Sequence, residues 1–205
     1  MAQLSKASIL VLLCVVSAVA PAQTQEPVRI IKEGNGNVVN FRAEGSLAST
    51  QAVNCIPLAE AKNSFTPPDL YKGVLDCLAR DNYESAAELF ALAGIYGRFD
   101  AERVADKTAG QAKTVLIMNA FAAVSDEKKS RFNAALGRIT GSPEVLGRLC
   151  RQVAAVGMPD YYPSYMILHG IRAFTGNPHE GAIVKDFDAS GVWKNLQSAY
   201  LHCPA

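Results

Sequence analysis

The chain has 205 residues, with 20 basic and 19 acidic side chains and a formal net charge of +1. The charges are interspersed, which argues against a nucleic-acid partner, because affinity for phosphates comes from concentrated lysine and arginine. The same pattern gives no support to a charged membrane surface as the partner. The length fits a single domain that follows a short leader.

Residues 1–22 are typical of a secretory signal peptide. Lys6 precedes an apolar run from Ile9 to Val16, and Ala20-Pro21-Ala22 offers a cleavage site of small residues. The apolar run is about a dozen residues, short of the roughly 20 that span a bilayer. We therefore expect cleavage after Ala22 and no stable membrane insertion. Cleavage would remove one base, Lys6, and no acid, so the mature chain would have no net charge.

Export changes the cysteine count from five to four, because Cys14 lies within the predicted signal peptide. The remaining cysteines are Cys55, Cys77, Cys150 and Cys203. An even number in an oxidising compartment predicts two disulfides, for which three pairings are open from sequence. We favour Cys55–Cys77 and Cys150–Cys203, because each would tie a loosely held segment onto a neighbouring helix. No CxxC motif or zinc-ligand spacing occurs, so we expect no metal and no cofactor.

The segment from residue 23 to residue 57 is polar with scattered apolar residues. A turn cluster, Glu33-Gly34-Asn35-Gly36-Asn37, lies between Val28–Ile31 and Val38–Phe41. This pattern fits either one β-hairpin or a flexible leader. The sequence leaves both open.

From residue 58 to residue 205 the apolar residues follow helical periodicity. The first two helices carry Leu70 to Leu78 and Ala86 to Ala93, with a turn at Arg80–Asn82 between them. Asp100 is predicted to begin a third helix that runs to Val124, after a turn at Tyr96–Asp100. A fourth helix is predicted after its cap at Ser125, with Gly141 just beyond its end, and a fifth after its cap at Ser142, ended by Gly157 and Pro159. A sixth is predicted from Pro163 to a stop at Gly176, with Ile167, Gly170, Ile171 and Phe174 buried, and a last one at the C-terminus around Trp193. The fold class is therefore all-α, an irregular bundle of about six or seven helices, with a small hairpin if residues 23–57 are ordered.

The second predicted helix carries the pattern Tyr83-x2-Ala86-x3-Phe90-x2-Ala93, which resembles one tetratricopeptide-type repeat. The match is partial, since Asp81 stands where glycine is usual. A shift of 34 residues does not reproduce the pattern. This indicates one repeat-like hairpin within an irregular bundle rather than a solenoid.

The charged segment Tyr96–Ala112 has two readings. Its acids and bases at helical spacing fit a solvated helix face with weak ion pairs, which we favour. They also fit a buried polar network around Arg103.

The motif Asp160-Tyr161-Tyr162-Pro163-Ser164-Tyr165 is a candidate binding surface, because tyrosines are favoured as interface anchors. Packing between helices is the alternative that we favour for these rings. Residues 177–189 form a predicted recognition loop that contains Glu180, Asp186 and Asp188.

Histidines offer the one catalytic alternative. His179 with Glu180 or Asp186 could form a general-base pair, although no nucleophile is evident. For His169 we favour a structural role on a helix.

Together, the signal peptide, the Pro67-Pro68-led hairpin, the Tyr96–Asp100 segment and the Leu201–Pro204 end resemble small periplasmic proteins of Gram-negative bacteria. Some of these are immunity proteins of interbacterial toxin pairs that are delivered by type IV or type VI secretion. The resemblance implies a periplasmic binding protein without enzymatic activity that neutralises a cognate secreted effector. We expect the contacts to be Tyr161, Tyr162, Tyr165, Asp186 and Asp188. The alternatives are a scaffold that binds envelope proteins through the hairpin groove and, with less support, a periplasmic hydrolase with His169 or His179 beside an acid.

Overall fold

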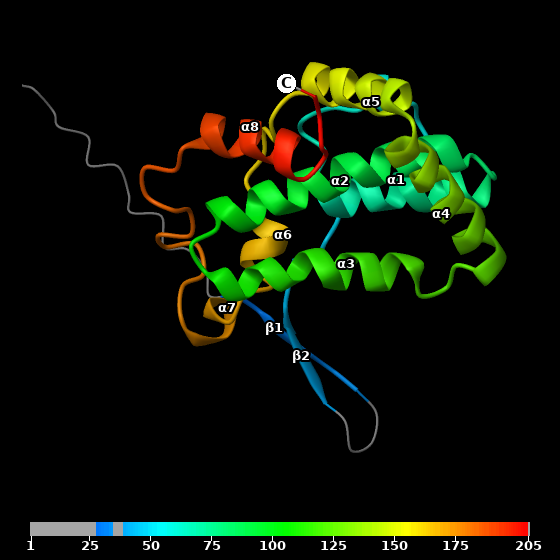
Figure 1. Ribbon diagram of the computed structural model, residues 1–205. Coiled ribbons are helices and arrows are strands. Elements are labelled where there is room, and N and C mark those ends of the chain that lie inside the picture. The colour runs from blue at the N-terminus through cyan, green and yellow to red at the C-terminus, as the bar shows by residue number, and fades with distance from the viewer. Residues whose placement is uncertain (1–27, 35–38, 205) are drawn as a thin grey trace, which may run out of the picture.

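A helical body and one β-hairpin make up the part of the chain that the computed structural model describes, residues 28–34 and 39–204 (Figure 1). The predicted signal peptide, residues 1–22, lies outside the described residues. The elements in chain order are β1 (Ile30–Glu33), β2 (Asn40–Ala43), η1 (Leu58–Glu60), α1 (Pro67–Ala79), α2 (Tyr83–Arg103), η2 (Lys107–Gln111), α3 (Ala112–Phe121), α4 (Asp126–Gly141), α5 (Pro143–Val156), α6 (Ser164–Ile167), α7 (Arg172–Thr175) and α8 (Ala189–Ala199). The mostly helical fold class with a small N-terminal hairpin is confirmed.

The hairpin extends away from the helical body (Figure 1). β1 and β2 pair in antiparallel register, with Ile31 opposite Arg42. Ala43 is fully buried at the base of the hairpin and packs with Leu168 and Ala173, whereas Phe41 is exposed. The hairpin reading of this segment is therefore the correct one.

Local signals fix the start of α1. Thr66 and Asp69 form a reciprocal capping box, and Pro67 and Pro68 occupy the first turn, where a missing N–H costs nothing. The predicted turn before α2 is confirmed. Its middle residue, Asp81, has a left-handed φ of 57° at the position where a repeat of this type has glycine.

The central helix α2 is longer than predicted. The expected turn at Tyr96–Asp100 is absent, and the prediction of a helix beginning at Asp100 is wrong, because α2 continues to Arg103. Tyr96 and Phe99 are buried on the continued helix, and both pack against Trp193 of α8. The chain turns at Val104 instead, where its backbone forms a β-bridge with Ile183.

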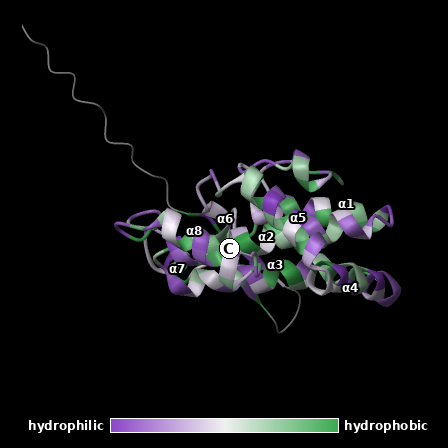
Figure 2. Ribbon diagram, turned by 45° about the horizontal axis from the view of Figure 1, so that its top comes forward, coloured by the Kyte–Doolittle hydropathy of each residue, from purple (hydrophilic) through white to green (hydrophobic). Residues whose placement is uncertain are grey.

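The two helices after α3 confirm their sequence signals. The side chain of Ser125 caps α4, and that of Ser142 caps α5, which has Pro143 in its first turn. Gly157 ends α5 with a φ of 89°, a conformation that favours glycine. Hydrophilic residues are prominent along α4, and hydrophobic ones concentrate around α2 (Figure 2).

The predicted single helix from Pro163 to Gly176 is wrong, because the chain forms two short helices, α6 and α7. Gly170 lies between them, against the carboxylate of Asp106, which accepts a hydrogen bond of 3.0 Å from the backbone of Arg172. The side chains of Ile171 and Phe174 are 59% and 45% exposed, so they do not form the expected buried stripe.

Two disulfides join the ends of the body to its helices. Cys55–Cys77 ties the segment before η1 to α1, and Cys150–Cys203 ties the C-terminal segment to α5. Both favoured pairings are confirmed, and they indicate a non-reducing compartment. Among the described residues, no helix is both long and apolar enough to cross a membrane.

Candidate binding site

A cleft of about 400 Å³ lies where the end of α2 meets two later segments of the chain, residues 158–163 and 183–189. We call it the Tyr162 cleft. Its lining residues are Phe99, Arg103, Met158, Pro159, Tyr162, Pro163, Ile183, Val184, Phe187 and Ala189. The β-bridge between Val104 and Ile183 brings these distant segments together.

Arg103, which lines the Tyr162 cleft, belongs to a buried polar network around Asp100. This carboxylate is fully buried and accepts a hydrogen bond of 2.8 Å from Nε of Arg103. The hydroxyls of Tyr161 and Tyr165 donate to its second oxygen at 2.9 and 2.7 Å. The guanidinium of Arg103 also lies 5.3 and 5.1 Å from the ring centroids of Phe99 and Tyr161. The buried polar network around Arg103 is therefore the correct interpretation of this charged segment, and the favoured interpretation as a solvated helix face is wrong.

Burial dominates the electrostatics of this network. It raises the pKa of the Asp100 carboxyl, while the guanidinium of Arg103 and the hydroxyls of Tyr165 and Tyr161 act in the opposite direction. The guanidinium of Arg103, 2.7 Å from the carboxylate, favours the charged form of this carboxyl and opposes the effect of burial. Burial, followed by the negative charge of Asp100, raises the pKa of both tyrosines well above the usual value. They therefore act as neutral hydrogen-bond donors.

The three predicted tyrosine contacts separate in the structure. Tyr165 is only 3% exposed, so its prediction as a partner contact is wrong. Tyr161 is partly buried and its hydroxyl is bonded to Asp100, which assigns it to packing between helices as well. Tyr162 is 48% exposed and lines the cleft. Of the three rings, only that of Tyr162 is therefore available to a partner.

The predicted acidic contacts lie next to the Tyr162 cleft in sequence, but neither of them lines it. Asp186 is exposed, in a turn with a φ of 55°. Asp188 is exposed too, but its carboxylate accepts a hydrogen bond of 2.9 Å from the backbone of Gly191 and caps α8. The residue between them, Phe187, is the one that lines the cleft.

Sequence reasoning missed the apolar rim of the cleft. Met158 and Ile183 are each 36% exposed and line the cleft with Tyr162. Met158 and Ile183 belong to no helical or strand periodicity in the sequence, so nothing there predicts that they lie together. The β-bridge between Val104 and Ile183 brings their segments together. Exposed apolar clusters of this kind mark interaction surfaces.

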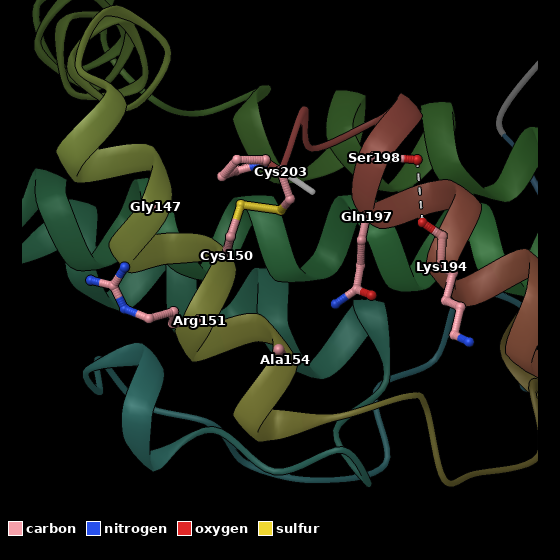
Figure 3. A pocket seen from close by; sticks show the side chains of 9 residues that line it. Gly147, Cys150, Arg151, Ala154, Lys194, Gln197, Ser198 and Cys203 are labelled. Atoms are coloured by element: carbon pink, nitrogen blue, oxygen red, sulfur yellow. Dashed lines mark hydrogen bonds between the residues drawn. A yellow bond between two sulfur atoms is a disulfide. The ribbon is translucent and has the colours of Figure 1, made fainter.

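A second hollow, of about 380 Å³, lies between α5 and the C-terminal segment (Figure 3). The Cys150–Cys203 disulfide forms part of its wall. Within α8, the hydroxyl of Ser198 donates a hydrogen bond to the carbonyl of Lys194. Arg151 and Lys194 supply its charge. No acid lines it, and it brings together none of the predicted site residues except the two cysteines.

The two histidines of the hydrolase alternative, His169 and His179, each lie beside a hydroxyl. His169 is half-buried beside the hydroxyl of Ser46, 3.1 Å from its ring nitrogen, and burial lowers its pKa. His179 lies 3.3 Å from the hydroxyl of Tyr162. Neither lines the Tyr162 cleft. Within residues 28–34 and 39–204, no group of three or more histidine, cysteine, aspartate or glutamate side chains could hold a metal ion.

Comparison of the chain with protein-family models, with curated proteins and with solved structures finds no match in any of the three.

Proposed function

We propose that this protein is a periplasmic immunity protein, which neutralises a cognate secreted antibacterial effector by binding it through the Tyr162 cleft. The observation that carries this proposal is the exposed rim of Met158, Tyr162 and Ile183 above the buried Asp100 network. Exposed apolar side chains on a rigid support lose little conformational entropy when a partner binds.

The disulfides support the periplasm as the compartment, and the resemblance of the sequence layout supports the class of immunity proteins. Two disulfides suit an oxidising compartment such as the periplasm. Neutralisation by occlusion requires a rigid, complementary surface and no catalytic group on the inhibitor. The Tyr162 cleft offers an aromatic anchor at its rim, the type of residue that dominates binding energy at interfaces.

The scaffold alternative has less support, because other helices already cover most of α2. α2 contacts α1, α3, α4 and α8, and most of its residues are buried. A partner could not reach most of α2 without displacing part of the body.

The test is co-expression in the periplasm with the product of the neighbouring gene, followed by measurement of survival and of binding by co-purification. We expect protection by the unaltered protein. Tyr162→Arg should weaken binding by about 10-fold or more, as expected for a central aromatic contact. Met118→Arg, on α3, is the matched control, because Met118 is 65% exposed and outside the cleft.

Failure of the unaltered protein to protect cells and to co-purify with the neighbour would overturn the immunity proposal. If Tyr162→Arg and Met118→Arg weaken partner binding equally, or if neither weakens it, the Tyr162 cleft is rejected as the contact surface.

A further inference from the structure

A separate cavity of about 180 Å³ lies along α2, and none of the residues of the Asp100 network lines it. α1, α2, α3 and the side chain of Tyr200 enclose it. Its lining residues are Pro67, Tyr71, Phe90, Ala93, Gly94, Gly97, Arg98, Lys113, Leu116, Ile117 and Tyr200. We call it the Arg98 cavity.

Two cationic side chains line the Arg98 cavity, and no acid does. Neither Arg98 nor Lys113 forms an ion pair within the described residues. Arg98 lies 3.6 Å from the centroid of the Tyr200 ring and gives one N–H to the carbonyl of Gly94 at 3.4 Å. Partial burial and the charge of Arg98 lower the pKa of Lys113, while Glu102 raises it. Two neighbouring cations that form no ion pair attract an anion.

Two phenol hydroxyls add neutral donors to the same cavity. Burial raises the pKa of Tyr71 and of Tyr200, so both hydroxyls keep their protons. Neither forms a hydrogen bond with another described residue, although both rings line the cavity. Both hydroxyls can therefore donate to an anion in the cavity.

Two glycines in the interior of α2 make room for these groups. A Cβ atom at Gly94 would collide with the Tyr200 hydroxyl, and one at Gly97 would lie 3.2 Å from Cγ of Lys113. Glycine is a poor helix former. Its presence at both positions lets the hydroxyl and the lysine stem lie directly against the helix backbone.

We propose that the Arg98 cavity binds a small organic carboxylate. A guanidinium fork matches a carboxylate, and Lys113 with the two hydroxyls can satisfy its remaining lone pairs. The apolar wall of Pro67, Phe90 and Ile117 suits the carbon body of such an acid, whereas a bare inorganic anion would lose hydration against this wall and gain no apolar contact. A cavity of about 150 Å³ accommodates benzene, so this one is large enough for an aromatic acid.

The test uses benzoate, its neutral isostere benzamide, and inorganic phosphate with the purified, oxidised protein. Isothermal titration calorimetry should give a saturable one-site isotherm for benzoate. Benzamide should bind at least about 10-fold more weakly, because it lacks the charge that the two cations recognise. Phosphate should bind more weakly than benzoate.

The residues are tested by single substitutions. Lys113→Gln should weaken benzoate binding by about 10-fold, the loss expected for one charged hydrogen bond. Arg98→Gln should weaken benzoate binding by at least as much. If the Arg98→Gln variant unfolds because it loses the contact with Tyr200, the Lys113→Gln variant still tests the proposal. Arg151→Gln, an exposed arginine on α5, is the control and should bind as the unaltered protein does.

Three outcomes would overturn the proposal: benzamide binding as tightly as benzoate, phosphate binding more tightly than benzoate, or unchanged benzoate affinity in Lys113→Gln. No outcome depends on the identity of a toxin, so the Arg98 cavity and the immunity proposal can fail separately.

Discussion

The hydroxyl of Tyr165 donates a hydrogen bond of 2.7 Å to Oδ2 of Asp100, across 65 positions of the chain. The bond joins the last turn of α2 to α6. Tyr161 donates to the same oxygen, and Arg103 occupies the other one. One buried carboxylate therefore fixes the direction in which the segment from Tyr161 to Tyr165 crosses α2.

Replacement of Asp100 should be among the most destabilising polar changes. Asp100→Asn keeps the shape but leaves Arg103, whose side chain is 12% exposed, without its counter-ion. We expect a loss of about 3–5 kcal/mol in the free energy of unfolding, as for other broken buried ion pairs. Urea unfolding followed by circular dichroism measures it.

The control is Asp126→Asn, because Asp126 is fully exposed and pairs with Lys129 only at 3.5 Å. It should change stability by less than about 0.5 kcal/mol. If Asp100→Asn also changed the free energy of unfolding by less than about 0.5 kcal/mol, the buried network around Asp100 would not stabilise the fold. If Asp100→Asn does not fold, Tyr165→Phe should still lower stability by about 1.5–3 kcal/mol, as one hydrogen bond to a charge is lost.

Acid should weaken the anchoring of the segment before α1 through Asp69. Burial alone would raise the pKa of this carboxyl, but hydrogen bonds from the backbone of Gln51 and from Thr66 and Ser49 outweigh it and lower the pKa. The folded state therefore holds the carboxylate more strongly than the unfolded state does. Its contribution is complete above the ordinary pKa of 3.8 and is lost as pH falls through the lower folded value.

Asp69→Asn should cost about 2 kcal/mol or more at neutral pH, since several hydrogen bonds to a charge are removed. The difference in unfolding free energy from the unaltered protein should shrink below about pH 4. Urea titrations at several pH values measure this difference. A difference that stays constant down to pH of about 3 would show that Asp69 does not titrate with folding.

Local signals were sufficient to predict most helices. The caps at Ser125 and Ser142 and the Pro67-Pro68 start are properties of adjacent residues, so sequence reveals them without knowledge of the tertiary structure. The favoured disulfide pairings were also correct, because each cysteine pair joins an irregular segment to a nearby helix.

The errors lie where tertiary contacts decide the outcome. Asp100 has the chemistry of a helix cap, but in the structure α2 continues past it. Its carboxylate is instead a buried acceptor for Arg103 of the same helix and for two tyrosines that lie more than 60 positions later in the chain. Likewise, Asp106 binds the backbone of Arg172 and interrupts a helix that periodicity favoured. The rim of the Tyr162 cleft depends on the bridge between Val104 and Ile183, a contact across 79 positions that has no local signature.

The two disulfides should contribute unequally. The chain-entropy model gives about 4 kcal/mol for Cys150–Cys203 and about 3 kcal/mol for Cys55–Cys77, because they close loops of 53 and 22 residues. Thermal unfolding of Cys150→Ser/Cys203→Ser and of Cys55→Ser/Cys77→Ser compares them. The first variant should have the lower melting temperature, and the reverse order would show that contacts of the freed segments outweigh loop length.

The two helix glycines Gly94 and Gly137 should respond to alanine with opposite signs. Nothing lies within 4 Å of a Cβ atom at Gly137, in the middle of α4, so Gly137→Ala should stabilise the protein by about 0.5–1 kcal/mol through helix propensity. At Gly94 the same gain is opposed by the collision with the Tyr200 hydroxyl, and displacement of a packed ring costs about 1–3 kcal/mol. Gly94→Ala should therefore destabilise the protein in urea unfolding. Stabilisation of both variants would mean that Tyr200 moves aside freely, and the Tyr200 wall of the Arg98 cavity would then not be rigid.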